Sequence, residues 1–96
     1  MRPESVLDND MIEVKYKDKL IALGLNVAYY RKYRLMTQAE LAEKASVSVS
    51  TIQKLENANL YTRVSLETIC KIADALGVSE SDLLDFKKLK KNFDEF

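Results

Sequence analysis

The sequence predicts an all-α domain of five helices, and three observations support this fold class. Residues that favour helices, such as Leu, Ala, Lys and Glu, are abundant, whereas only two Gly and one Pro occur among 96 residues. Apolar residues recur at helical spacing in several separate segments. Residue types that begin or end helices stand between these segments. A chain of this length forms one domain with a single modest core.

A first helix is expected from about Asp18 to Arg34. Its apolar residues at helical spacing are Leu20, Leu23, Val27 and Tyr30. Gly24 in its interior weakens helix formation slightly. The preceding segment, Met11 to Lys17, alternates apolar and charged residues, which suits either a half-buried strand or a lead-in to this helix.

The second and third helices begin at residues suited to N-capping. Thr37 and Glu40 have the spacing of a capping box, and the apolar side of that helix follows as Leu41, Ala42 and Ala45. After a short break at residues 45–47, Ser48 is a good N-cap for a third helix that extends to about Ala58.

Serines also mark the start of the fourth and fifth helices. Ser65 precedes a helix that carries Leu66, Ile69, Ala73 and Leu76, and Gly77 stands at its C-terminal end. Ser79 precedes a short helix with Leu83, Leu84 and Phe86. Residues 87–96 extend that helix or form a solvated tail. The chain therefore divides into an N-terminal extension (1–17), a helical domain (18–86) and a basic C-terminal segment (87–96).

The formal net charge is zero, but the charges are unevenly distributed along the chain. Residues 19–64 carry seven basic and three acidic side chains, a net charge of +4, and residues 65–86 carry one basic and five acidic ones, a net charge of −4. Residues 1–18 and 87–96 contribute −2 and +2. A basic middle segment is compatible with nucleic-acid binding, which depends on the local field, although chance clustering explains it equally well.

Catalysis has little support in the sequence. The chain has no His, no metal-ligand spacing and no Gly-rich phosphate loop, so we expect no catalytic residue, metal, cofactor or small-molecule substrate. The single Cys70 excludes an internal disulfide and is expected to be a buried thiol. No apolar run reaches membrane-spanning length and residues 1–10 do not resemble a signal peptide, so we expect a soluble cytoplasmic protein with no membrane partner.

The third helix has a polar face that can bind DNA. Ser50, Gln53, Lys54 and Asn57 share this face, with Val49 at its leading edge, whereas Ile52 and Leu55 point toward the core. Hydroxyl, amide and ammonium groups can bond base edges, and a valine can contact a thymine methyl group. Because any solvated helix presents a polar face, this pattern alone does not distinguish DNA binding from plain exposure.

An ordered set of short motifs runs from Val27 to Leu84, about 58 of the 96 residues. The motifs are Arg31, Thr37-Gln38, Glu40-Leu41-Ala42, Val47-Ser48, Ser50-Thr51-Ile52, Leu55-Glu56-Asn57, the stretch Ser65 to Ile69 and the stretch Lys71 to Val78. In this order and spacing they resemble the Cro/lambda-repressor-type, or XRE-type, helix-turn-helix family. The resemblance implies a compact five-helix lambda-repressor-like domain that binds DNA.

The resemblance also implies roles for particular residues. Gln38 is expected to bond a backbone phosphate, and Arg31 and Glu56 to form a structural pair between the first and third helices. The other residues expected at the DNA are Ser48, Val49, Ser50, Thr51, Gln53, Lys54, Asn57 and Arg63. Arg63 has the alternative of a solvated loop arginine. The three tyrosines Tyr29, Tyr30 and Tyr33 are expected to pack on or beside the core rather than against bases.

Three positions depart from the family pattern, because Leu35, Ser46 and Ala58 stand where the family usually has Gly. Glycine is favoured in turns because it adopts positive φ without steric cost. The geometry of the connecting loops is therefore open at this point.

We expect a sequence-specific transcriptional regulator, a repressor, that acts as a homodimer on a palindromic operator in double-stranded DNA. Two recognition helices would then occupy successive major grooves about 34 Å apart. The dimer surface is expected at the last helix and an end segment, with Leu83, Leu84, Phe86, Ile12, Val14 and Tyr16. The alternatives are a DNA-binding antitoxin, a restriction–modification controller, or a protein-interaction module that kept the fold without DNA contacts.

Overall fold

A computed structural model of the chain describes residues 14–59 and 62–86. The elements are a 3-10 helix, η1 (Val14–Tyr16), and the α-helices α2 (Lys17–Tyr33), α3 (Gln38–Ala45), α4 (Val49–Glu56), α5 (Leu66–Leu76) and α6 (Glu80–Leu83). No strand occurs in the described ranges, so the all-α, five-helix prediction is confirmed. Residues 14–17 are helical, as in a lead-in to the first helix, and residues 11–13 lie outside the described part.

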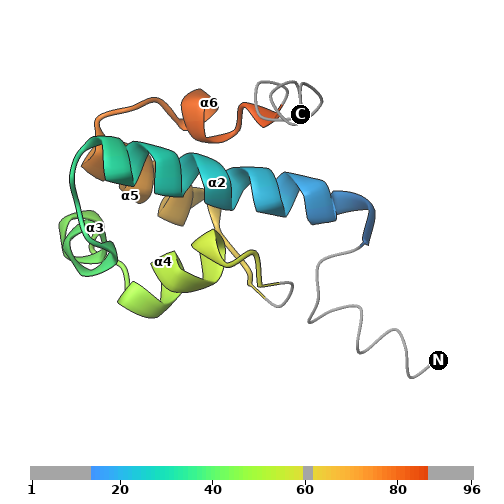
Figure 1. Cartoon of the computed structure of the whole chain (residues 1–96), viewed down its shortest axis with the longest axis horizontal. Helices are drawn as coiled ribbons and strands as arrows, with labels where there is room; N and C mark the ends of the chain where they lie inside the picture. The colour runs from blue at the N-terminus through green and yellow to red at the C-terminus, as the bar shows by residue number, and fades with distance from the viewer. Residues whose placement is uncertain (1–13, 60–61, 87–96) are drawn as a thin grey trace.

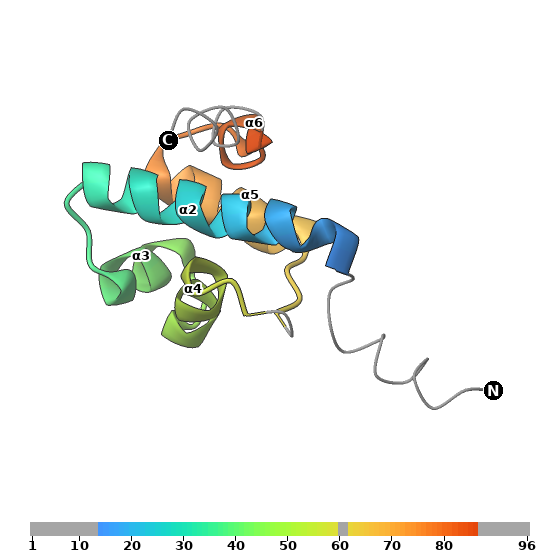
Figure 2. The ribbon, with the colours of Figure 1, turned by 45° about the vertical axis from the view of Figure 1, so that its right-hand side comes forward.

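The helices are arranged around α2, which crosses the centre of the molecule (Figure 1). In Figure 1 α4 lies below α2, α6 above it and α5 behind it, and the turned view keeps this arrangement (Figure 2). α4 packs against both α2 and α3, and α3 also packs against α5. The largest fully buried side chains are Val27, Leu41, Ile52, Leu55, Ile72, Leu76 and Leu83. One apolar core therefore joins all five α-helices.

The helix ends follow the local signals in the sequence. Thr37 and Glu40 form the predicted capping box, in which the Glu40 N–H donates to Thr37 Oγ1 (3.0 Å) and the Thr37 N–H donates to Glu40 Oε1 (2.8 Å). Ser48, Ser65 and Ser79 cap α4, α5 and α6 through their hydroxyl groups. Gly77 ends α5 in the left-handed conformation, with φ of 71°. The predicted caps are thus confirmed.

The three positions that lack the family's glycine keep a glycine-like backbone. Leu35, Ser46 and Ala58 are the non-glycine residues with positive φ in the described ranges, at 59°, 58° and 52°. A side chain in this region costs free energy, because its Cβ crowds the following carbonyl oxygen. The turns therefore keep their shape despite an unfavourable conformation at each site.

Gly24 of α2 lies against the backbone of α4. A Cβ built on Gly24 would stand 2.0 Å from the carbonyl oxygen of Leu55 and 3.3 Å from the Cα of Glu56. These are backbone atoms of α4 and its end, so they cannot move aside as a flexible side chain can. The glycine that weakens α2 locally is what allows α4 to pack this closely.

Several burial predictions were wrong or only partly right. Leu83 was expected on a dimer surface but is fully buried in the core of the same chain. Tyr29 and Tyr33 are exposed, at 58% and 71%, because their side of α2 faces away from the core, whereas Tyr30 packs against it. The thiol of Cys70 is free and half-buried rather than fully buried.

No helix in the described part of the chain combines the length and the hydrophobicity that a membrane span needs.

Candidate nucleic-acid interface

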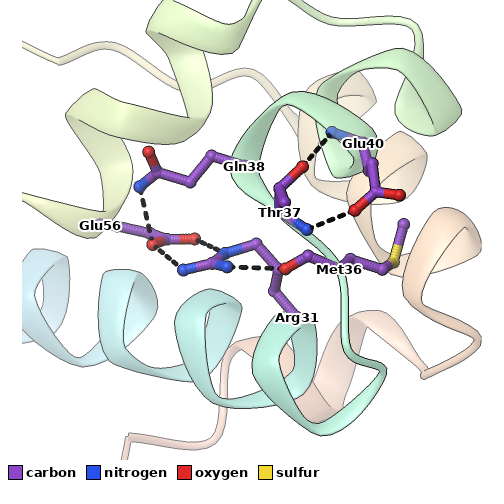
Figure 3. A network of polar contacts seen from close by, with 6 residues as sticks. All are labelled: Arg31, Met36, Thr37, Gln38, Glu40 and Glu56. Carbon is purple, nitrogen blue, oxygen red and sulfur yellow. Dashed lines mark hydrogen bonds and ion pairs between the residues drawn. The ribbon is translucent and has the colours of Figure 1, made fainter.

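An ion pair links α2 to the C-terminal end of α4, the first and third of the five predicted helices. Arg31 of α2 donates from Nε to Glu56 Oε2 (2.7 Å) and from Nη2 to Glu56 Oε1 (2.9 Å) (Figure 3). Its Nη1 donates to the carbonyl oxygen of Met36 (2.7 Å). The two side chains are only 11% and 8% exposed. Hydrogen bonding to Glu56 raises the pKa of Arg31 above its ordinary value, so the guanidinium stays charged.

Gln38 extends this network to a third helix. Its Nε2 donates to Glu56 Oε1 (3.0 Å), so the carboxylate at the end of α4 binds side chains from both α2 and α3 (Figure 3). An amide nitrogen carries two hydrogens, and Glu56 occupies one of them. The predicted phosphate contact of Gln38 stays a prediction, and the structure adds a second role in holding α3 against α4.

The two faces of α4 are separated as the helical spacing predicts. Ile52 and Leu55 are buried, at 0% and 1% exposed. The residues on the opposite face and at its leading edge are exposed, namely Val49, Ser50, Gln53 and Lys54, as is Asn57 at the C-cap. The buried contacts and the Glu56 network fix the orientation of α4, so the exposed face has a defined direction in space.

Ser48 and Thr51 are engaged within α4. The Thr51 N–H donates to Ser48 Oγ (3.1 Å), and the two hydroxyl oxygens are 2.9 Å apart. Ser48 therefore satisfies a backbone donor at the start of the helix. Thr51 is half-buried, whereas Ser50, Gln53 and Lys54 on the same helix are exposed.

Arg63 belongs to the connection between α4 and α5 rather than to α4, and its side chain is exposed. Two residues of the same connection, 60–61, are outside the described part. The phosphate contact of Arg63 stays a prediction.

Sequence reasoning missed two groups that position α4. Gly24 allows the close contact with Leu55, and the carbonyl of Met36 binds Arg31. A glycine inside a helix indicates only lower helix propensity, and any residue can supply a carbonyl acceptor. Neither contact could therefore be predicted without knowing how the helices pack.

The exposed residues of α4 can form hydrogen bonds with a ligand. Within residues 14–59 and 62–86, no group of three His, Cys, Asp or Glu side chains gathers as metal ligands. The exposed face of α4 offers hydroxyl, amide and ammonium groups, which suit base edges and phosphates.

A family model and curated relatives both relate this chain to helix-turn-helix proteins. A family model described as helix-turn-helix matches residues 27–83. The HTH-type transcriptional regulator SinR of Bacillus subtilis (strain 168) is 38% identical over 65 residues, which cover 68% of this chain and 58% of SinR. The SinR of Bacillus licheniformis is 37% identical over the same length and coverage. The chain thus spans less than two thirds of the length of these curated relatives.

Proposed function

The chain belongs to the helix-turn-helix family, and from this premise we propose that it is a DNA-binding transcriptional regulator whose helix α4 enters the major groove. The main support for this proposal is that α4 has a buried apolar face and an exposed polar face. Ile52 and Leu55 anchor the helix, while Ser50, Gln53 and Lys54 remain free to face a ligand.

The exposed side chains match the chemistry of the major groove. The Gln53 amide can bond adenine, the Lys54 ammonium can bond guanine, and the Ser50 hydroxyl can bond either type of base edge. Val49 is 40% exposed at the start of the helix, where its methyl groups can contact a thymine methyl. This set supports sequence-specific binding rather than binding to the DNA backbone alone.

The Glu56 network supports the same function by fixing the reading helix. Arg31 and Gln38 hold α4 from two different helices, at distances between 2.7 and 3.0 Å. Base readout requires side chains placed within a few tenths of an ångström, which a rigidly packed helix provides. The second N–H of Gln38, together with Asn57 and Arg63, is proposed to contact phosphates and set the register.

We further propose that the regulator is a repressor and binds a palindromic operator as a homodimer. A two-fold arrangement would place two copies of α4 in successive major grooves, about 34 Å apart. SinR is described as a transcriptional regulator, which supports the regulatory part of this proposal.

Binding to random duplex DNA at increasing salt concentration tests the proposal. Affinity should fall steeply as salt rises, because basic side chains displace counterions from phosphates. The variant Lys54→Ala should bind its preferred sequence about 1–3 kcal/mol more weakly. Lys44→Ala is the matched control, since Lys44 is an exposed lysine on α3 outside the α4 face. An absence of salt-dependent binding would instead identify a protein-interaction module.

A further inference from the structure

The outer side of α2 carries an exposed stripe that the DNA-binding site does not use. Leu25 and Tyr29 are among the exposed large hydrophobic residues, at 37% and 58%, and Ile21 beside them is half-buried. In Figures 1 and 2 the described helices lie below, behind and above α2, and none covers the side that faces the viewer. An exposed apolar helix face of this kind can serve as an interaction surface.

The stripe has a regular spacing. Asp18, Ile21, Leu25, Tyr29 and Lys32 follow one another at intervals of three or four residues. Residues three and four apart share one face of a helix, so these five form a single seam about 21 Å long. We call this set the α2 seam.

The α2 seam is its own complement when two copies are placed antiparallel. If Leu25 lies on the two-fold axis, Ile21 faces the partner's Tyr29, and Asp18 faces the partner's Lys32. At each end of the paired seams, Asp18 of one copy therefore lies opposite Lys32 of the other. Within residues 14–59 and 62–86, no hydrogen bond or ion pair engages the side chain of Asp18 or of Lys32, so both charges are available.

We propose that the α2 seam is the contact surface for a second copy of this chain, with the two α2 helices antiparallel and Leu25 at the two-fold axis. Of the dimer surface expected at the last helix and an end segment, Leu83 is buried within its own chain, whereas Leu84 is 39% exposed. α2 contacts α4 from its inner side, through Gly24, so pairing at the seam leaves the exposed face of α4 free. This pairing goes beyond the operator-bound homodimer of the proposed function. Because α4 packs directly against α2, the two α4 helices of a seam-paired dimer lie closer together than the roughly 34 Å between successive major grooves.

A single helix pair is a small interface compared with the roughly 1,200 Å² or more that stable complexes bury. We therefore expect reversible dimers at micromolar concentrations.

Cysteine crosslinking of the 96-residue chain, without DNA, tests the geometry. In a Cys70→Ala background, Leu25→Cys should form a disulfide-linked dimer, since facing helices bring the two-fold position within disulfide reach. Ile21→Cys and Tyr29→Cys should crosslink when mixed but not separately. Leu66→Cys is the control, because Leu66 is 70% exposed on α5, outside the seam. A Leu25→Cys chain that crosslinks no faster than Leu66→Cys overturns the proposal, as does Ile21→Cys crosslinking with itself.

Charge reversal tests the pairing of the seam ends by sedimentation. Asp18→Lys and Lys32→Asp should each weaken the dimer roughly tenfold, because each places like charges opposite one another at both ends. The double variant should recover the original association. A double variant no stronger than the singles contradicts the antiparallel register. DNA binding of the same variants is measured separately, so failure of the seam is distinguishable from failure of the DNA-binding function.

Discussion

Replacing Gly24 with Ala should destabilise the protein, although the same change in an ordinary helix stabilises it. The added methyl would stand 2.0 Å from Leu55 O, more than 1 Å inside ordinary contact distance, so α2 and α4 must separate. Overpacking of this kind costs about 1–3 kcal/mol or more. Helix propensity returns only about 1 kcal/mol when Gly becomes Ala.

We therefore expect Gly24→Ala to lower the free energy of unfolding by up to about 2 kcal/mol, or Tm by up to roughly 16 °C for a domain of this size. Urea and thermal denaturation followed by circular dichroism measure this change. The matched control is Ala28→Gly in the same helix, where the side chain is half-buried and the propensity loss is measured on the same scale. A Gly24→Ala protein more stable than the parent would refute the close contact of α2 with the α4 backbone.

Three further predictions concern the turns, the ion pair and the capping box. Leu35→Gly should stabilise the protein by about 0.5–1 kcal/mol, because glycine adopts the positive φ at this position without steric strain. Leu35→Ala keeps the Cβ and should not stabilise the protein. Equal changes in the free energy of unfolding for the two variants would contradict this prediction. Arg31→Ala should cost about 3–5 kcal/mol, since the buried Glu56 carboxylate loses its cationic partner and keeps only the neutral amide of Gln38. The double variant Arg31→Ala/Glu56→Ala should cost less than the sum of the singles, and strict additivity would argue against the pair. The hydrogen bond with the Thr37 backbone lowers the pKa of Glu40 below its ordinary 4.5, so its stabilising contribution is present above that pH and lost as the pH falls through the folded-state pKa. Glu40→Gln should flatten the acid dependence of stability more than Glu43→Gln on the same helix, and identical acid transitions in the two variants would count against the capping box.

Features governed by neighbouring residues could be predicted from the sequence. The capping hydroxyls of Thr37, Ser48, Ser65 and Ser79 act within three residues, so their spacing is visible in the chain. The two faces of α4 follow in the same way, from helical periodicity. These local rules were sufficient for the all-α fold class and for the exposed set on α4.

Features that depend on contacts between distant residues could not be predicted in this way. Gly24 reads as a weak point in α2 until the α4 backbone is placed against it. Leu83 belongs to a short amphipathic segment, and only the packing of α6 decides that its side chain is buried. Gln38 resembles a phosphate ligand, yet its amide also binds Glu56, which is 18 residues away.

The three residues at positive φ illustrate a different limit. Leu35, Ser46 and Ala58 are unfavourable in this conformation, so propensity alone argues against turns of this shape. The surrounding helices impose the conformation, because each residue connects or ends helices whose packing is already fixed by the core. Tertiary structure here overrides local preference at a modest cost in stability.

Selection of bound sequences from a random pool of duplex DNA is the most direct test of α4 as the reading helix. The parent protein should enrich a motif with two related half-sites. Gln53→Ala and Lys54→Ala should each lose preference at one or two neighbouring base pairs in each half-site and keep it elsewhere. An unchanged base preference in both variants, or no enriched motif for the parent protein, would contradict the assignment of α4 as the helix that reads DNA.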